Sequence, residues 1–567
     1  MSVLVAIGAT LAHAIAVQPS RIEEQYLQLF DDHNSTVSAS PRNCVSLSLG
    51  DGSNGVVADG SFIMPSLGQF QMNGMQVNGA LDAYGKLSRF TISGSRVCFA
   101  ARQMETGFWN ASVAAGRVAP GLLFYETTPP RGYSAMHNLN GPNDSAWLSL
   151  GPFNLLATSA YLLRYFCCLT SSASCQPRVR IETCPPPDSY VNTVRLGERF
   201  YGVTDSKFVV EFDPISLSIL GDVKYHDHLD RLTVALGSAH PLPDLEPTHR
   251  GCVLGVRPQE VAMMVHEVLI YRLCEDAPTT RVKVAKYHTG SQLAYFHSFG
   301  LSPRFAILPL QHITFDMITV MTKGNVKAAF KPYDLGKPTK VVLLPLAQGE
   351  KARTFELPGD VYFVHAVNSF ETKTTNGSCV IFDSTAYTTN FFSDTLLSDW
   401  KNATIRDHST ARGTVSRFTF HTSGPREGEV EQTPLSVPGR STDFPKINMA
   451  FHGKPYCFYY AVEWFHDDEH FSRMAIVRQD VCTGKRSHWY REGSFPSEPT
   501  FVQRKQGTGA EDDGVIMFTL LDGASGKTSL MFVDAATMQA VGEAPAPRDA
   551  AIGYTTHGQW FEGVGGV

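Results

Sequence analysis

Short runs of β-branched and aromatic residues, separated by Gly, Asp, Pro and Asn, dominate the chain beyond about residue 190. Runs of this composition are typical of β-strands joined by turns. We expect strands at Arg199–Val203, at Phe208–Phe212 ending in a turn at Asp213-Pro214, and at Tyr456–Val462. The spacing predicts an all-β architecture, either an array of sandwiches or a β-propeller. No repeat of fixed period is visible, so the pattern alone leaves the number of blades open.

Two pairs of runs near the C-terminal end have the strand-turn-strand spacing of hairpins. The pairs are Met474–Arg478 with Ser487–Tyr490, turning at Thr483-Gly484, and Gly514–Leu520 with Ser529–Val533, turning at Asp522–Lys527. Helical periodicity is limited to two patches, Arg21–Phe30 and Thr388–Trp400.

Length and composition narrow the class of protein. A chain of 567 residues exceeds the usual single domain, so it forms either several domains or one large closed β architecture. A hydrophobic content of 43%, a charged content of 18% and a formal net charge of -6 are those of a globular protein with no electrostatic reason to bind nucleic acid. We therefore expect an apolar or neutral substrate.

Cysteine usage and the N-terminal residues leave the compartment open between the cytoplasm, a plastid and the secretory route. The 11 cysteines show neither a disulfide framework nor a Cys-x-x-Cys zinc pattern, and we expect most of them to be buried reduced thiols. Residues 1–17 are apolar and suit a signal or targeting segment, although no basic residues precede them. Sequons for N-glycosylation begin at Asn34, Asn110, Asn143, Asn376 and Asn402.

The segment Trp147–Cys168 is apolar but is interrupted by Gly151-Pro152 and carries Arg164. It is therefore unsuited to span a membrane. Two interpretations remain: a patch that lies in the membrane interface, or a buried helix followed by a loop.

Four histidines lie in short apolar, strand-like contexts: His240, His297, His365 and His557. A metal ligand must present one ring nitrogen at a fixed point, and strand ends with close-packed neighbours are suited to this. The chain has 19 histidines, and a single histidine beside aromatic residues is more often structural. It is their shared surroundings that make these four candidates for a non-haem iron centre.

Other polar clusters are weaker candidates. The stretches 466–470 and 226–228 are rich in His, Asp and Glu, but their polarity predicts exposed loops without a hydrophobic wall. Gly507 and Gly509 lack the strand and helix of a nucleotide-binding loop, and Ser298 lacks the Gly-x-Ser-x-Gly context of a nucleophile.

Several motifs resemble those of the carotenoid cleavage oxygenases, a family that includes the retinal pigment epithelium isomerohydrolase. They occur in family order from about residue 185 to 561, and an upstream stretch, Leu81 to Gly85 followed by Phe90, is weakly similar as well. The matching segments are Val191-Asn192, Ala239-His240-Pro241, His297-Ser-Phe-Gly-Leu-Ser-Pro, Val364-His365-Ala-Val-Asn-Ser-Phe-Glu, Asp443-Phe-Pro-Lys-Ile-Asn, Ser497-Glu498-Pro-Thr-Phe-Val, Glu511-Asp-Asp-Gly-Val and His557-Gly558.

The resemblance implies a seven-bladed β-propeller with a helical, loop-built dome over an axial Fe2+ site. Residues 18–567 would form this single domain, with 147–168 as a membrane-interface insertion. His240, His297, His365 and His557 would be the metal ligands. Carboxylates that orient them would be Asp205, Asp443 and Glu498. Glutamate is usual in the family at the first two of these carboxylate positions, and aspartate is one methylene shorter.

The implied activity is oxidative cleavage of a conjugated double bond in a carotenoid or apocarotenoid, with O2 as cosubstrate and two carbonyl products. Alternatives are a retinoid-ester isomerohydrolase, cleavage of a stilbene-type phenylpropanoid, and a metal-free binding scaffold. We expect no nicotinamide, flavin or 2-oxoacid, and peripheral association with a membrane that holds the lipophilic substrate. Aromatic residues beside the ligands line either a substrate tunnel or, as we favour, the propeller core: Phe296, Phe299, Phe363, Phe370 and Trp560.

Overall fold

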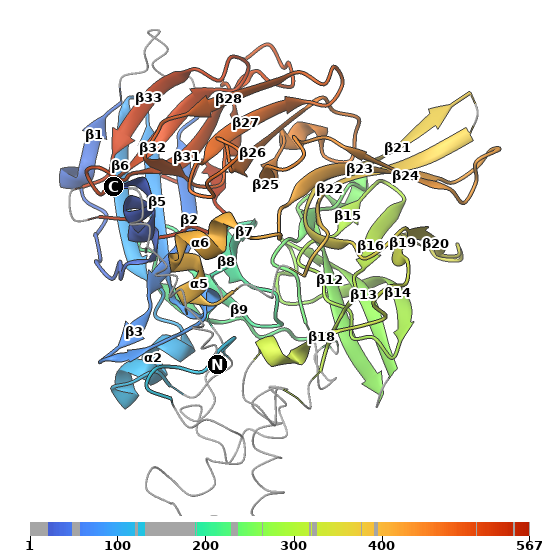
Figure 1. Ribbon diagram of the computed structural model, residues 1–567, viewed down its shortest axis with the longest axis horizontal. Helices are drawn as coiled ribbons and strands as arrows, with labels where there is room; N and C mark the ends of the chain where they lie inside the picture. Colours follow the sequence, from blue (N-terminus) through green and yellow to red (C-terminus); the bar gives the residue numbers. More distant parts are fainter. Residues whose placement is uncertain are drawn as a thin grey trace, which may run out of the picture.

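The computed structural model describes residues 21–565 except 48–56, 120–122, 131–187, 189, 228, 230–235, 263–264, 317–318, 320–325, 376, 391–394, 506 and 548–549. Seven antiparallel sheets of four or five strands follow one another along the chain and form a ring (Figure 1). This is the seven-bladed β-propeller that the family resemblance implied.

Each blade is built from strands that are close in sequence, except for one strand in the first blade. The first blade contains β1 (Cys44–Ser46), β2 (Gly60–Gln69), β5 (Tyr84–Ser93), β6 (Arg96–Gln103) and β34 (Gln559–Glu562). The second contains β7 (Asn192–Leu196), β8 (Arg199–Val203), β9 (Val209–Phe212) and β10 (Ile219–Asp222). The third contains β11 (Leu242–Pro243), β12 (Cys252–Ala262), β13 (Val265–Cys274) and β14 (Val282–Gly290).

The remaining four blades repeat this arrangement. The fourth contains β15 (Gly300–Leu301), β16 (Phe305–Leu310), β19 (Thr339–Pro345) and β20 (Arg353–Leu357). The fifth contains β21 (Tyr362–Thr374), β22 (Gly377–Tyr387), β23 (Thr414–His421) and β24 (Val430–Pro434). The sixth contains β25 (Ser441–Lys446), β26 (Phe458–Trp464), β27 (Ala475–Asp480) and β28 (Arg486–Tyr490). The seventh contains β29 (Ser494–Pro496), β30 (Thr500–Gln503), β31 (Gly514–Asp522), β32 (Lys527–Asp534) and β33 (Ala540–Pro545).

Outside the blades, the described residues form two short hairpins and several short helices. The hairpin strands are β3 (Gln71–Met72), β4 (Met75–Gln76), β17 (Ile313–Phe315) and β18 (Phe330–Pro332). The α-helices are α1 (Arg21–Tyr26), α2 (Gly107–Ala115), α5 (Leu397–Lys401) and α6 (Ala403–Asp407). The 3-10 helices are η1 (Leu27–Phe30), η2 (Pro41–Asn43), η3 (Ala80–Asp82), η8 (Pro247–His249), η9 (Lys327–Ala329) and η11 (Met449–Phe451).

The strands expected from the sequence beyond residue 190 are confirmed, with bounds that differ by at most two residues. The strands β2, β5 and β6 in the first blade were not expected. All ten residues of β2 are buried, so its sequence does not alternate between apolar and polar positions. A strand covered on both faces is hard to recognise by its pattern.

The two expected helical patches fare differently. Arg21–Phe30 is helical over its whole length, as α1 followed by η1. In the patch Thr388–Trp400, the helix α5 begins only at Leu397, and residues 388–390 are not helical.

The apolar core lies between neighbouring blades. One buried cluster joins the third and fourth blades through Val256, Ile270, Leu308 and Val342. Similar clusters lie between the fourth and fifth, the fifth and sixth, and the seventh and first blades. Each sheet therefore buries both faces, as stacked sheets in a ring require.

The ring is closed by β34, which pairs antiparallel with β2 and places Trp560 opposite Phe62. Figure 1 shows the blue strands of the N-terminal part beside the red strands of the C-terminal part. Residues at the two ends of the described chain therefore share one blade.

The expectation of reduced cysteines is wrong for six residues. The disulfides are Cys44–Cys98, Cys252–Cys274 and Cys457–Cys482, whereas Cys379 is a buried free thiol. The first two pairs are opposite residues on neighbouring antiparallel strands. Their separations of 54 and 22 residues along the chain hide this pairing in the sequence.

Candidate metal centre

Four blades contribute one histidine each, at or just before the strand that lies at the inner end of the sheet. His240 precedes β11, His297 precedes β15, His365 is the fourth residue of β21, and His557 precedes β34. The inner strands of neighbouring blades contact each other, for example β15 with β21 and β34 with β7. They therefore surround the axis of the ring, and the four histidines meet there.

The Nε2 atoms of the four imidazoles form a compact group. His297 Nε2 lies 3.1 Å from His240 Nε2 and 2.9 Å from His365 Nε2, and His365 Nε2 lies 3.1 Å from His557 Nε2. One ring nitrogen of each histidine lies within 4.8 Å of those of the other three. The structure brings together all four residues that the sequence predicted as ligands.

The other three blades contribute the carboxylates. Asp205 follows β8, Asp443 lies in β25, and Glu498 lies between β29 and β30. Their oxygens accept hydrogen bonds from the Nδ1 atoms of His297 at 2.7 Å, His365 at 2.7 Å and His557 at 2.8 Å, respectively. Within the part of the chain that the structure describes, His240 has no carboxylate at its ring.

Each carboxylate accepts at least one further hydrogen bond, at the same oxygen in Asp205 and at the other oxygen in Asp443 and Glu498. Asp205 Oδ2 accepts from the hydroxyl of Tyr295 at 2.6 Å, and Asp443 Oδ2 accepts from the hydroxyl of Tyr387 at 2.6 Å. Glu498 accepts from the backbone N–H of Gly558 at 3.0 Å and pairs with Lys446 Nζ at 3.3 Å. The two aspartates thus reach their histidines although they are shorter than glutamate.

Burial and the neighbouring imidazoles favour the neutral form of two of the four histidines. Burial, together with the neighbouring imidazoles, lowers the pKa of His240 and of His557 well below the ordinary value. Burial also acts to lower the pKa of His297, but the contact with Asp205 outweighs it and raises this pKa. Burial raises the pKa of Glu498 to about 7, with Lys446 opposing.

The donor set fits a divalent cation. Where Nδ1–H donates to a carboxylate, the neutral imidazole has an unprotonated Nε2 with a lone pair. Three such lone pairs, from His297, His365 and His557, face one another, and a cation between them would satisfy all three. Imidazole ligands suit zinc, copper, iron and nickel, so the ligands alone do not select the ion.

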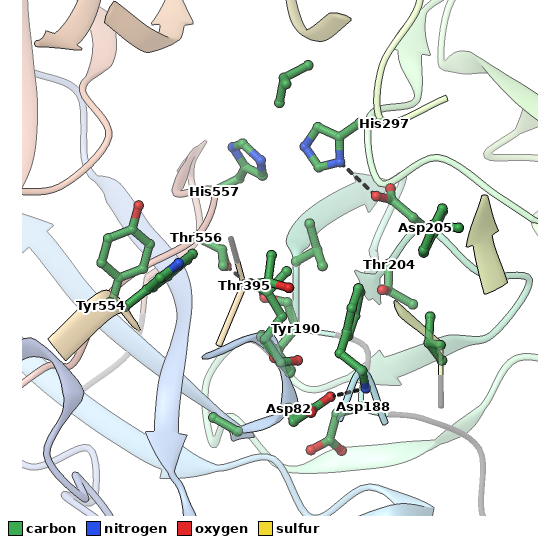
Figure 2. Close-up of a pocket in the computed structure, with 18 of the residues that line it drawn as sticks. Asp82, Asp188, Tyr190, Thr204, Asp205, His297, Thr395, Tyr554, Thr556 and His557 are labelled. Atoms are coloured by element: carbon green, nitrogen blue, oxygen red, sulfur yellow. Dashed lines mark hydrogen bonds and ion pairs between the residues drawn. The ribbon is translucent and has the colours of Figure 1, made fainter. Parts of the chain in front are cut away.

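A cavity of about 470 Å³ extends from His297, His365 and His557 into the part of the molecule formed by the helices and loops. Figure 2 shows His297 and His557 on one side of this cavity and Asp82 and Asp188 on the opposite side. The aromatic lining comes from segments far apart in the sequence: Tyr26, Phe108, Phe124, Phe315, Phe330, Trp400, Phe444, Phe471 and Tyr554. Such a lining suits a long apolar ligand.

Phe444 forms part of the wall beside the imidazoles. Its ring centroid lies 4.9 Å from that of His365 and 5.3 Å from that of His557. Its φ of 55° is unusual for a residue with a side chain, and the pairing of β25 with β26 is irregular at this point. This backbone turn lets adjacent residues serve different roles, since Asp443 contacts His365 while Phe444 faces the cavity.

The aromatic residues beside the ligands belong to the core, as we favoured, and do not line the cavity. Phe296, Phe299, Phe363 and Phe370 are buried in clusters between blades, and Trp560 packs against another such cluster. The residues that do line the cavity have no common sequence signal. The helical periodicity of Thr388–Trp400 was the nearest indication, because Trp400 was on its apolar face.

The weaker candidates remain outside the site. His466 pairs with Glu463 at 2.8 Å and His470 with Asp467 at 2.7 Å, and Asp227 is bonded to Arg281. Ser298 is structural, since its hydroxyl donates to the carbonyl of Val364 at 2.6 Å.

The segment Trp147–Cys168 and residues 1–17 lie outside the described residues, so the expectations for them stay predictions. Among the described residues, none of the helices combines the length and the apolar character needed to cross a membrane.

Comparison with known proteins gives matches over most of the chain. The sequence model of the family described as retinal pigment epithelial membrane protein matches residues 57–562. The chain is 23% identical to Beta,beta-carotene 15,15'-dioxygenase of Mus musculus over 65% of its length and 69% of the mouse protein. It is 26% identical to a carotenoid dioxygenase of Neurospora crassa, over 62% of this chain and 60% of that protein. With the torulene dioxygenase of Fusarium fujikuroi, it is 28% identical over 47% of this chain and 49% of that protein. Several of these alignments thus cover less than two thirds of the relative.

Solved structures match the fold more completely. A mutant of the Synechocystis apocarotenoid oxygenase superimposes with a TM-score of 0.69 at 17% identity, covering 95% of this chain and 99% of that chain. The cobalt-substituted form of the same oxygenase gives a TM-score of 0.69 at 18% identity with the same coverage. At these identities the likeness supports the fold.

Proposed function

The chain belongs to the family described as retinal pigment epithelial membrane protein, and from this premise we propose that it is an iron(II)-dependent carotenoid or apocarotenoid oxygenase. The reaction would split one conjugated carbon–carbon double bond with O2, so that each oxygen atom ends in one of two carbonyl products. The observation that supports this most directly is the group of four imidazoles, one from each of four blades, beside an apolar cavity. Relatives named as carotenoid and apocarotenoid dioxygenases support the substrate class.

His240, His297, His365 and His557 would hold the metal through their ring nitrogens. A ferrous ion held there would supply the means of activating O2 for addition to an electron-rich double bond. Asp205, Asp443 and Glu498 would fix the ring orientation of three ligands and keep their Nε2 atoms unprotonated. The polyene itself would supply the electrons, so no organic cosubstrate is required.

The cavity would position the substrate and exclude water from it. Adjacent double bonds of a polyene are chemically similar, so the bond that lies beside the imidazoles is selected by how deeply the chain enters. Phe444 faces the cavity next to His365 and His557, and would pack against the polyene close to the reacting bond.

The test combines metal analysis with product analysis. Protein purified anaerobically should contain about one iron per chain. Oxygen uptake should be measured with β-carotene, an apocarotenal, a retinyl ester and resveratrol, and the products weighed by mass spectrometry after reaction under 18O2. Conversion of the retinyl ester without oxygen uptake would contradict the proposal, as would cleavage of resveratrol alone.

We propose that the protein takes its substrate from a membrane surface through the segment Trp147–Cys168. The support is the broken apolar sequence of this segment and the insolubility of polyenes in water. Flotation with liposomes should carry the wild-type chain upward. Replacement of Leu155 and Leu156 by Ser should reduce flotation. The control is Leu335→Ser, which changes an exposed leucine outside this segment and should leave flotation unchanged.

For the compartment, we propose entry into the secretory route. Disulfides persist in oxidising compartments, and three pairs are present among the described cysteines. The sequon residues Asn34, Asn110 and Asn402 are all exposed and therefore accessible to glycosylation. Treatment of the protein from its native cells with a glycosidase should increase its mobility on a gel, and an unchanged mobility would count against secretory entry.

A further inference from the structure

A carboxyl group lies on the wall of the cavity opposite the imidazoles. Asp188 lines the cavity, and Figure 2 places it on the other side of the view from His297 and His557. The lining of this cavity is mainly apolar and includes Leu81, Ala83, Phe108, Leu123 and Phe124. A polar group in such a wall needs an explanation, since burial of a carboxyl group without hydrogen bonds is unfavourable.

Among the described residues, two hydrogen bonds satisfy only part of the hydrogen-bonding capacity of Asp188. The hydroxyl of Thr106 donates to Oδ1, and the backbone N–H of Gly85 donates to Oδ2 at 3.3 Å. A carboxylate can accept about four hydrogen bonds. Burial raises the pKa of Asp188 to about 7, with the two hydrogen bonds opposing. The group thus retains acceptor capacity on a cavity wall.

The polar neighbours of Asp188 are engaged by the protein. Asp82 accepts the backbone N–H groups of Phe124 at 2.6 Å and Tyr125 at 3.1 Å. Tyr190 donates its hydroxyl to the carbonyl of Leu81 at 2.5 Å. These contacts give Asp82 and Tyr190 clear structural roles, whereas Asp188 retains acceptor capacity for a hydrogen-bond donor on a ligand.

We propose that Asp188 accepts a hydrogen bond from a hydroxyl group at the end of the substrate, so that the preferred substrate is a polyene with a hydroxylated end-group. The inference rests on the proposed function and narrows its substrate class. A hydroxyl anchored at Asp188 fixes how far the polyene extends toward His297 and His557. The same contact therefore selects the double bond that lies beside the imidazoles.

A purely structural role for Asp188 makes different predictions. Thr106 is the N-cap of α2, and its hydroxyl links that helix to Asp188. If Asp188 served only to hold α2, its replacement would alter all substrates alike. A role in recognition changes the ratio between substrates and the position of cleavage.

The experiment compares two polyenes of equal length, one with a hydroxyl on its terminal ring and one without. The wild-type enzyme should favour the hydroxylated polyene by about tenfold or more in kcat/KM, the effect of one hydrogen bond to a buried carboxyl group. Asp188→Asn and Asp188→Ser should lose most of this preference, retain turnover of the unsubstituted polyene, and give mixed cleavage products. Glu105→Gln, which removes a charge from an exposed residue beside Thr106, should behave as wild type.

Binding provides a readout that does not depend on turnover. Trp400 lines the cavity, so a bound polyene should quench tryptophan fluorescence in the metal-free protein. The Kd of the hydroxylated polyene should be lower than that of the unsubstituted polyene in wild type. This difference should be reduced in Asp188→Asn.

The possible failures are distinguishable. Equal kcat/KM and equal Kd for the two polyenes in wild type, or a preference that persists in both Asp188 variants, overturns the inference and leaves the proposed function intact. Selective binding of the hydroxylated polyene without cleavage of either substrate supports the inference and contradicts the proposed function.

Discussion

Tyr387 donates its hydroxyl to Asp443 Oδ2 at 2.6 Å, while Oδ1 of the same carboxylate accepts from His365 Nδ1 at 2.7 Å. The short carboxylate is thus fixed at both oxygens between a tyrosine and an imidazole. The contacts of Asp443 with His365 and Tyr387 also outweigh its burial and lower its pKa. Asp205 also lies between a tyrosine and an imidazole, but Tyr295 and His297 both donate to its Oδ2, and its Oδ1 accepts from the backbone N–H of Ala239.

Tyr387→Phe should weaken metal binding without unfolding the protein. The change removes one hydrogen bond to a buried charged group, of the kind that contributes about 1.5–3 kcal/mol. Loss of a group that orients a metal ligand commonly reduces metal affinity about 10- to 100-fold. Competition with a chelator would measure this affinity. Tyr333→Phe, which removes a hydroxyl contact with Ser291 at the surface, is the matched control; equal affinities in both variants would contradict the role of Tyr387.

His297→Ala should abolish both metal content and turnover, because His297 Nε2 lies within 3.1 Å of the Nε2 atoms of two other imidazoles. Elemental analysis and oxygen uptake would check this together. The control is His470→Ala, since His470 pairs with Asp467 in a loop outside the site. Retention of one metal per chain in the His297 variant would contradict the assignment.

Addition of a divalent metal to metal-free protein should raise the melting temperature. The lone pairs of His297, His365 and His557 face one another without a cation, and binding to the native state alone stabilises it by mass action, by about 2.7 kcal/mol at a hundredfold excess over Kd. Differential scanning fluorimetry with Fe2+ under anaerobic conditions, and with Co2+, would measure the shift. The same shift in His365→Ala would show that the ion binds elsewhere.

Stability should fall as the pH drops from 6.5 to about 4, owing in part to His452. Burial lowers the pKa of this residue from 6.5 to about 4, with the carbonyl of Pro243 opposing, and its side chain is only 9% exposed. In this window the unfolded chain takes up a proton that the native chain does not, so the contribution present above pH 6.5 is lost as the pH falls. The full loss is about 3 kcal/mol. In denaturant unfolding, the loss of stability between pH 7 and pH 4.5 should be smaller in His452→Gln than in wild type. In the control His408→Gln, at an exposed position, this loss should equal that of wild type.

Removal of the Cys252–Cys274 disulfide should lower stability without loss of the metal site. The bridge links opposite residues of β12 and β13 in the third blade, and a bridge of this kind contributes about 2–4 kcal/mol. The double variant Cys252→Ser with Cys274→Ser should unfold at lower denaturant concentration. Cys379→Ser, at a free thiol, is the comparison; equal midpoints would indicate that the bridge does not form.

Many strands of the ring and the residues at its centre were predictable, because strand composition and short sequence motifs indicate them locally. Arg199–Val203 has the residues of a strand and forms β8 with the same bounds. The four histidines and three carboxylates lie within short motifs, and the structure joins each of Asp205, Asp443 and Glu498 to an imidazole.

The features that sequence reasoning missed depend on contacts between distant segments. Cys44 and Cys98 face each other only because β1 and β6 pair, and the cavity wall joins residues as far apart as Tyr26 and Tyr554. The aromatic residues beside the ligands belong to the core, as favoured from the sequence. Phe296 is buried in the cluster between the third and fourth blades, whereas its neighbour His297 faces the other three imidazoles.

The closure of the ring by β34 has a consequence for biosynthesis. Gly558 alone separates His557 from β34, and the strands of the other six blades are synthesised before it. A growing polypeptide on the ribosome therefore carries His240, His297 and His365 before His557 is added. A cation that needs all four imidazoles would be held in full only after β34 has been translated and has paired with β2.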